Sequence, residues 1–313
     1  MTEINWSLAM FAARETPAVL MRSVAAVLAA TRPRMTVEIL TNGNTALAQT
    51  IAGGLIQGLQ IPAAVNLRLW HIPYGDKANA WNQFLHHIWQ DQPLAFFVDG
   101  YARPRPDALR VLGDAVMGSH CANAGSGVPT VGFSATALRT HMLKNGGFHG
   151  NLCCVTGDSI ARIKQRGIRL PVGLYRTDSL METILAYDLD PAINEWDDAR
   201  VVVHGAASWD TDKLVWWHRS SLLVYWSRQL RQAQGNLEKQ AFKDFFDKRQ
   251  LVPELLPANC REMIEDWMLR CPRLAQATLR GHPLRQRALQ RLLQEPNPLP
   301  QSLLPTLIWS SAG

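Results

Sequence analysis

A short apolar run at 94–98 stops at Asp99 and is followed by Gly100, Tyr101 and two prolines. A run of this kind predicts a strand that is buried on both faces, as in a parallel sheet. Open α/β sheets bind ligands beyond the carboxyl ends of their strands, so Asp99 would stand where a ligand binds. The alternative is an Asp-Gly turn that merely ends the strand. The pattern of the surrounding chain bears on this choice.

Three earlier apolar segments precede this run, and each is followed by a helical or loop-then-helix pattern. Strands that alternate with helices predict an α/β protein whose sheet is mainly parallel and has right-handed crossovers. The second segment ends in a run of turn residues, and two glycines weaken the helix after it. We expect strands at 7–13, 37–40, 67–70 and 94–98, and helices at 18–30, 46–59 and 78–89.

The pattern changes beyond residue 110. We expect a helix at 111–117, a Gly/Ser-rich loop at 124–131 and a glycine-rich loop at 145–151 that leads into a strand at 152–155. Helices follow at 157–164 and 179–187, the second with Thr177 as its N-cap. A strand at 199–203 would deliver His204 at its end. From Lys213 onward strand signals vanish, so we divide the chain into an α/β domain at 1–212 and a helical C-terminal region at 213–313.

The net charge of +6 is unevenly distributed. Residues 213–313 hold 15 Lys and Arg against 8 Asp and Glu, a charge of +7, whereas residues 1–212 carry −1. Such a basic region suits a membrane surface, nucleic acid or an acidic ligand. Apolar content of 47% excludes a disordered chain, and the apolar runs are shorter than a membrane span. Five cysteines without CxxC spacing, and no basic segment at the start, predict a cytoplasmic protein with reduced thiols.

Seven short motifs stand in a familiar order, although none is specific alone. The first 212 residues resemble the GT-A catalytic domain of family-2 (inverting) glycosyltransferases. The resemblance implies an α/β, Rossmann-like fold that binds a nucleotide-diphosphate sugar. The motifs are Ala12-Ala13-Arg14-Glu15, Thr41-Asn42-Gly43-Asn44-Thr45, Gly75-Asp76-Lys77-Ala78-Asn79-Ala80-Trp81-Asn82, Val98-Asp99-Gly100-Tyr101, Phe148-His149-Gly150-Asn151-Leu152, Arg176-Thr177-Asp178 and the strand that ends in His204.

The chemistry of glycosyl transfer explains why such residues are needed. The nucleotide must be held by polar groups at strand ends, its departing diphosphate needs a cation, and the acceptor hydroxyl needs a general base. Lys77 has an ordinary alternative as a solvated lysine at a helix start. Asn42 stands where the family usually has Asp. The resemblance implies a UDP- or GDP-sugar donor bound by Ala13, Glu15, Asn42, Lys77, Asn79, Asn82, Asp99 and Tyr101.

The metal site departs from the family pattern. Asp99 matches the first acid of the Asp-x-Asp motif, but Tyr101 replaces the second. A phenol is a poor ligand for Mg²⁺ or Mn²⁺. The resemblance implies that Asp99 binds an Mg or Mn ion together with His204, or that Asp99 holds the ribose directly. A histidine with a purely structural role is the alternative for His204.

The resemblance implies that Asp178 is the catalytic base, with Glu182, one turn further along the predicted helix, in reserve. An acid at this position could deprotonate an attacking hydroxyl if its pKa is raised. The alternative for Asp178 is an acid that only favours the start of a helix. The acceptor would be bordered by Phe148, His149, Gly150 and Asn151.

The helix predicted at 216–232 mixes tryptophans and arginines. This composition suits peripheral contact with the inner face of a membrane, and it suits equally a helix packed on the catalytic domain. We expect a nucleotide-sugar donor, an unidentified acceptor (a glycan, a lipid-linked or a small molecule), a possible homodimer and no nucleic-acid partner, because no nucleic-acid motif is present. The alternatives are a metal-independent relative, and a nucleotide-sugar-binding protein without transfer activity.

Overall fold

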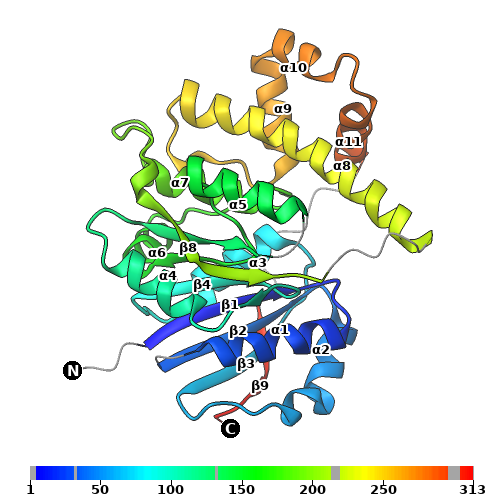
Figure 1. Cartoon of the computed structure of the whole chain (residues 1–313). Coiled ribbons are helices and arrows are strands. Elements are labelled where there is room, and N and C mark those ends of the chain that lie inside the picture. The colour runs from blue at the N-terminus through cyan, green and yellow to red at the C-terminus, as the bar shows by residue number, and fades with distance from the viewer. Residues whose placement is uncertain (1–4, 32–33, 131–132, 213–218, 295–303, 313) are drawn as a thin grey trace.

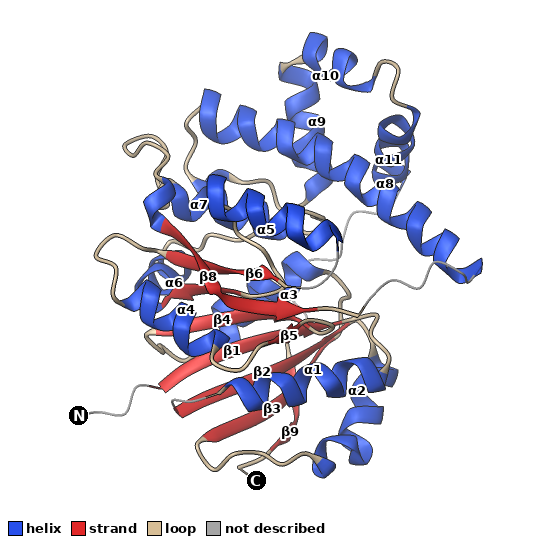
Figure 2. Ribbon diagram, in the orientation of Figure 1, coloured by secondary structure: helices blue, strands red, loops and turns tan. Residues whose placement is uncertain are grey.

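The computed structural model describes residues 5–31, 34–130, 133–212, 219–294 and 304–312. Within these residues a nine-stranded sheet has helices on both faces, and further helices from the C-terminal third form a separate layer at the top of the view (Figures 1 and 2). The strand order is β5-β8-β6-β7-β4-β1-β2-β3-β9.

Most helices follow a strand in the first two-thirds of the chain and follow one another afterwards. Short π or 3₁₀ segments extend three of them, at Ile51–Gly58, Phe84–Ile88 and Lys243–Lys248. The strands are β1 (Asn5–Ala12), β2 (Arg34–Asn42), β3 (Val65–Ile72), β4 (Leu94–Asp99), β5 (Arg103–Pro104), β6 (Ala124–Pro129), β7 (Cys153–Thr156), β8 (Val201–Asp210) and β9 (Thr306–Ser310). The helices are α1 (Pro17–Ala30), α2 (Thr45–Thr50), α3 (Lys77–Gln83), α4 (Ala108–Met117), α5 (Phe133–Asn145), α6 (Gly157–Gln165), α7 (Thr177–Ala186), α8 (Arg219–Phe242), α9 (Cys260–Arg270), α10 (Pro272–Leu279) and α11 (Pro283–Gln294).

The centre of the sheet is parallel, as predicted. β3, β2, β1 and β4 run in one direction, and β7 is antiparallel to β4. β6 is antiparallel to β7 and parallel to β8, so both point the same way as β4. The carboxyl ends of β1, β2, β4 and β8 therefore meet at one edge of the sheet, and the predicted α/β fold class is confirmed.

Two apolar layers cover the sheet, one on each face. On β1, Leu8 and Met10 belong to the layer beneath α1 and α4, whereas Phe11 belongs to the layer beneath α3 and α7. In the second layer Trp81 stacks on Phe97 with 3.8 Å between ring centroids. Every residue of β4 is buried, which confirms the strand predicted at 94–98.

The loop predicted at 124–131 is wrong over most of its length, because Ala124–Pro129 is the buried strand β6. The small side chains of this segment do not give the apolar pattern from which a strand is predicted. The close packing of the strand against α4 nevertheless requires small residues. A Cβ on Gly125 would lie 2.4 Å from Val116 of α4. Glycine thus lets the helix approach the strand closely.

Two further boundaries differ from prediction. β8 extends to Asp210, so His204 lies inside the strand rather than at its end. The small residues after His204 carry no strand signal, although they pair with β6. Thr177 is the first residue of α7 and is buried, whereas Arg176 occupies the N-cap position.

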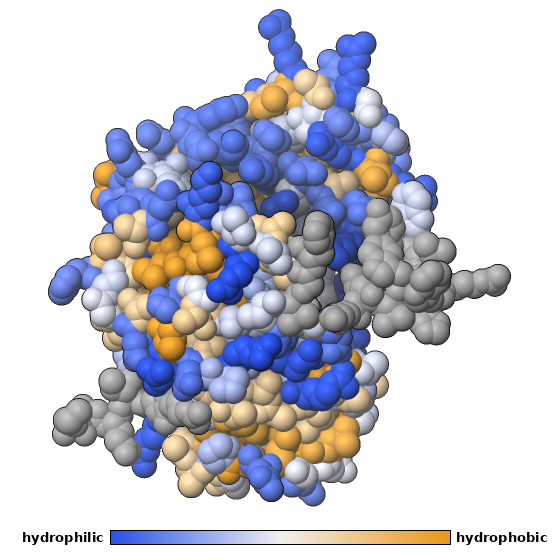
Figure 3. Space-filling view, in the orientation of Figure 1, coloured by the Kyte–Doolittle hydropathy of each residue, from blue (hydrophilic) through white to orange (hydrophobic). Residues whose placement is uncertain are grey.

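The C-terminal third is mainly helical, as predicted, but it is not free of strands. Thr306–Ser310 forms β9, which pairs antiparallel with the edge strand β3. The domain boundary near Asp212 stays a prediction. The surface over α8–α11 is mostly hydrophilic in the face shown (Figure 3).

The aromatic helix predicted at 216–232 lies partly outside the described residues. Residues 216–218 are not described, and α8 begins at Arg219. Among the helices that the structure describes, none combines the length and the apolar character required to cross a membrane.

Candidate active site

Asp99 is the last residue of β4, at the edge where the parallel strands end. Its backbone pairs with Phe11 of β1, and the residue is only 9% exposed. The following Gly100 donates its N–H to the Phe11 carbonyl at 2.8 Å, which turns the chain across the end of β1. The carboxylate is thus held at the crevice where open α/β sheets bind ligands.

Lys77 reaches Asp99 from the first residue of α3. The N-cap Asp76 accepts the Asn79 backbone N–H at 2.7 Å and starts the helix, while the buried Trp81 fixes its orientation against the sheet. Lys77 Nζ lies 2.5 Å from Asp99 Oδ1, and the lysine side chain is 30% exposed. The pair therefore stands at the site with one side open to solvent.

The protonation of this pair follows from its surroundings. Burial alone would lower the pKa of Lys77, but the charges of Asp99 and Asp178 outweigh it and raise the pKa. The negative charge of Asp99 raises the pKa of Tyr101 well above its ordinary value. Tyr101 therefore keeps its proton and donates its hydroxyl to Asp99 Oδ2 at 3.1 Å.

Asp178 lies in the first turn of α7 and joins this group from the opposite side. Asp178 Oδ1 accepts the Ser179 backbone N–H at 2.9 Å, and Oδ2 accepts the Gly150 N–H at 3.4 Å. A Cβ on Gly150 would lie 2.8 Å from Lys77 Nζ and 3.7 and 3.8 Å from carboxylate oxygens of Asp99 and Asp178. Two carboxylates and one ammonium therefore converge beside Gly150.

The predicted acceptor loop lines the same region. The His149 backbone N–H donates to Ser126 Oγ at 3.0 Å, and its Nδ1 accepts the Asn151 N–H at 3.2 Å. Burial lowers the pKa of His149, although Asp178 and Asp99 act in the opposite direction. The imidazole is therefore neutral at pH 7. Phe148 is buried in the core layer beneath α3 and α7.

The fold is similar to that of a solved mannosyltransferase structure. No family model and no curated protein sequence matches the chain. A mannosyltransferase from Pyrobaculum calidifontis, solved with GDP-Man and Mn²⁺, matches with a TM-score of 0.54 and 15% identity over 92% of this chain and 84% of that one. The chain has the GT-A fold.

Two further matches have lower TM-scores. A mycobacterial protein gives 0.49 with 10% identity over 75% of this chain and 73% of its own. Mouse xyloside xylosyltransferase 1 gives 0.35 with 10% identity over 51% and 69%. At these identities the likeness concerns the fold, and function has to be argued from the site.

Most of the remaining residues predicted to bind the sugar donor form hydrogen bonds with backbone groups. The Ala13 N–H donates to Glu15 Oε2 at 2.6 Å, at the end of β1. Asn42 Oδ1 accepts the Asp76 N–H at 3.0 Å, which ties the end of β2 to the start of α3. Asn79 is buried and donates to the Tyr74 carbonyl at 3.3 Å.

Asn82 is fully buried and lies behind the site rather than in it. Its amide donates to the Leu170 carbonyl and accepts the Leu170 N–H, each at 2.8 Å. With both ends of the amide engaged, Asn82 fixes the segment that leads into α7.

The predicted metal pair does not fit a divalent cation in this arrangement. Asp99 Oδ1 is paired with Lys77 and Oδ2 accepts from Tyr101, so both oxygens are engaged. His204 lies inside β8, where its Nδ1 accepts the Ala206 N–H at 3.3 Å. The described residues contain no cluster of three or more His, Cys, Asp or Glu side chains suited to a metal ion.

Glu238 of α8 was not found by sequence reasoning. It is fully buried, and its two oxygens accept the backbone N–H groups of Tyr175 and Arg176 at 2.9 Å each. Burial raises the pKa of Glu238, and the hydrogen bonds that it accepts oppose this rise. Glu238 therefore fastens the segment just before Asp178 to the C-terminal helices. The only sequence signal was an acid within the apolar pattern of a helix.

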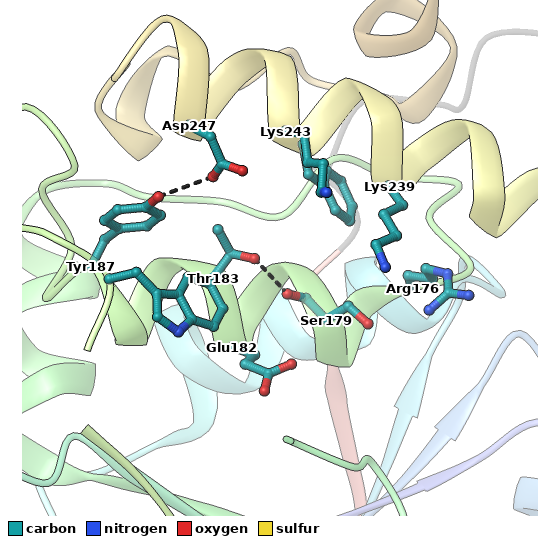
Figure 4. Close-up of a pocket in the computed structure, with 10 residues that line it drawn as sticks. Arg176, Ser179, Glu182, Thr183, Tyr187, Lys239, Lys243 and Asp247 are labelled. Carbon is teal, nitrogen blue, oxygen red and sulfur yellow. Dashed lines mark hydrogen bonds between the residues drawn. The ribbon is translucent and has the colours of Figure 1, made fainter. Parts of the chain in front are cut away.

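A pocket of about 390 Å³ lies between α7 and α8 and was also not predicted (Figure 4). Ser179 and Glu182 line it from α7, and Lys239 and Lys243 line it from the α8 side. Burial, and after it the charge of Asp178, raises the pKa of Glu182 to about 7. Glu182, with this near-neutral pKa, thus stands one turn from Asp178.

Proposed function

We propose that this protein is a glycosyltransferase that moves a sugar from a nucleotide-diphosphate donor to an acceptor hydroxyl with inversion. One observation carries the proposal, namely the convergence of Asp99, Lys77 and Asp178 around Gly150 at the ligand-binding edge of a GT-A sheet. GDP-Man in the similar mannosyltransferase supports a nucleotide-diphosphate sugar as the donor, which we expect to be a UDP- or GDP-sugar.

On the donor side, Asp99 and Tyr101 hold the nucleotide sugar, and Lys77 balances its charge. An ammonium group at this position stabilises the negative charge that develops on the departing nucleoside diphosphate. Ala13, Glu15 and Asn42 stand at the ends of β1 and β2 and border the nucleobase.

On the acceptor side, Asp178 is the general base. The acceptor oxygen attacks the anomeric carbon while its proton passes to the Asp178 carboxylate. The bond from the anomeric carbon to the diphosphate oxygen breaks on the opposite face, and the nucleoside diphosphate leaves with the electron pair. Glu182 is the reserve base, and its pKa of about 7 suits that role. The loop of Phe148, His149, Gly150 and Asn151 borders the acceptor.

Ligand-induced stabilisation tests the donor site. We expect UDP or GDP to raise the melting temperature, because a ligand that binds only the folded state stabilises it. Asp99→Ala should lower the affinity for that nucleotide by roughly tenfold or more, as expected when a buried charged partner is lost. Asp114→Ala, on the exposed face of α4, is the matched control. Equal nucleotide affinity in Asp99→Ala and Asp114→Ala would remove the central claim.

The role of a metal ion is tested separately. Asp99 and His204 were the expected ligands of Mg or Mn, and their present contacts do not fit one. We expect EDTA to reduce transfer only partly. Complete loss that Mn²⁺ reverses would show that the site rearranges to bind a cation when the diphosphate is present.

One alternative function and two expected partners have their own tests. Nucleotide binding without transfer to any acceptor would favour a nucleotide-sugar-binding protein. Contact with an anionic membrane through the basic C-terminal region is tested by sedimentation with anionic liposomes at low and high salt, since such attraction is screened. Homodimerisation is tested by the molecular mass in solution.

A further inference from the structure

The pocket between α7 and α8 has positive charges at one end. Arg176, Lys239 and Lys243 line it, and among the residues that the structure describes none of these three side chains has an acidic partner. Arg176 Nε is buried and has no hydrogen-bond partner there. Arg176 and Lys239 point toward one another at the same end (Figure 4). A pocket lined by these three cations suits an anion.

The other end of the pocket is aromatic and acidic. Tyr187 donates its hydroxyl to Asp247 at 3.0 Å, and its ring packs edge-on against Trp196 at 5.6 Å. Trp196 is 42% exposed, so part of its face is open to a bound molecule. The close-up shows Asp247 and Tyr187 together, away from Arg176 (Figure 4). The pocket therefore has two chemically different ends.

Its position connects the pocket to the reaction centre. Ser179 lines it and is the residue after Asp178, to which its backbone N–H donates at 2.9 Å. Glu182 lines it one turn further along α7. Asp178 faces Gly150 and Lys77 on the other side. The pocket therefore lies against the part of α7 that carries Asp178.

We infer that this pocket binds the acceptor, and that the acceptor carries an anionic group, a phosphate or a carboxylate, that Arg176, Lys239 and Lys243 hold. The inference rests on the proposed function and deepens it. The volume of about 390 Å³ lies within the range of small-molecule pockets. Guanidinium and ammonium groups bind oxyanions through charge-assisted hydrogen bonds. The aromatic end provides an apolar surface for a sugar ring.

Binding is measured by calorimetry on the whole chain with glucose 6-phosphate, glucuronate and glucose. We expect at least one of the two anionic sugars to bind and glucose to bind at least tenfold more weakly, since charged hydrogen bonds contribute most of the affinity. The anionic sugar that binds more tightly shows whether the pocket prefers a phosphate or a carboxylate. Binding of neither anionic sugar, or equal binding of glucose, overturns the inference.

Variants locate the binding. Lys239→Gln and Lys243→Gln should each lower the affinity for the anionic sugar by roughly 3- to 10-fold. Both lysines are exposed, so the fold should tolerate the changes. Lys248→Gln is the matched control, because Lys248 is an exposed lysine of the same helical segment outside the pocket. Equal effects of all three variants would indicate a general charge effect, and no effect in Lys239→Gln and Lys243→Gln would place the anion elsewhere. Either result overturns the inference.

UDP and GDP are titrated in the same preparations. If a nucleotide binds and neither anionic sugar does, the acceptor inference fails and the proposed donor site stands. The other outcome is that anionic sugars bind through Lys239 and neither nucleotide binds wild type. In that case the pocket binds an anion, but the transferase proposal fails and the bound sugar is not an acceptor.

Discussion

The two sides of the site are built in different ways. The donor side comes from the ends of β1, β2 and β4 and from the start of α3, and the sheet itself holds them in place. The acceptor side comes from α7 and α8, which lie outside the sheet. Glu238 of α8 joins it to Tyr175 and Arg176, which are 63 and 62 residues earlier in the chain. Glu238 fastens the two helices together. We therefore expect the donor side to keep its structure and its nucleotide affinity in variants that destabilise the acceptor side.

The packing behind each side explains the difference. Behind Lys77 and Asp99, the rings of Trp81 and Phe97 stack in the core at 3.8 Å between centroids. Behind Asp178, a buried carboxylate holds two backbone N–H groups. Apolar packing is distributed over many contacts, whereas a buried polar clamp depends on a single side chain.

The largest expected effect is on Glu238, the clamp of the acceptor side. Glu238→Ala leaves two buried N–H groups unpaired and should lower the free energy of unfolding by about 3–4 kcal/mol. Glu238→Gln keeps an acceptor oxygen and should cost less. Chemical denaturation measures both, with Glu265→Ala as the control, since its exposed ion pair with Arg261 contributes under about 1 kcal/mol. If nucleotide affinity falls in Glu238→Gln as much as transfer does, the two sides are not independent.

Asp178→Asn should separate the two sides kinetically. The amide keeps the shape and removes the basicity, so turnover should fall by roughly 10²-fold or more while nucleotide affinity is nearly unchanged. Transfer rates and nucleotide titration measure the two effects. Glu182→Gln, one turn away, is the control. Normal turnover in Asp178→Asn with loss in Glu182→Gln would exchange their roles, and no loss in either would favour a binding protein.

The pH dependence of stability tests the environment of Glu182. Its pKa is raised from 4.5 to about 7, so folding favours its protonated form. Glu182 therefore makes its full contribution to the free energy of unfolding below pH 4.5, and this contribution is lost as the pH rises to about 7. The free energy of unfolding of Glu182→Gln minus that of wild type should rise by about 2 kcal/mol across this range. A constant difference would show that Glu182 is solvated.

The smallest effect is expected on the donor side. Tyr101→Phe removes the hydrogen bond to Asp99 but leaves the Lys77 pair, so nucleotide affinity should change by roughly 3- to 5-fold, about 1 kcal/mol. Calorimetry with the nucleotide that stabilises wild type measures it. A loss as large as that of Asp99→Ala would make the phenol, rather than the carboxylate, the principal contact.

Much of the donor side could be predicted from local sequence. The apolar run before Asp99 specified a strand buried on both faces, and the order of strands and helices specified a parallel centre. The fold class is confirmed, whereas the roles of the site residues stay predictions. The pairing of Lys77 with Asp99 was not predicted, because their 22-residue separation says nothing of side-chain distance.

What the sequence by itself determined is therefore the set of elements that carry their own hydrophobic period, and the acids at their ends. Only the tertiary structure decided β6, the length of β8, the addition of β9 to the sheet and the clamp at Glu238. The physical reason is common to all four. Glycine-rich or short segments become strands because neighbouring strands supply hydrogen bonds, and a buried acid is stable because a distant loop supplies two N–H groups. These partners are remote in the chain, so no local pattern records them.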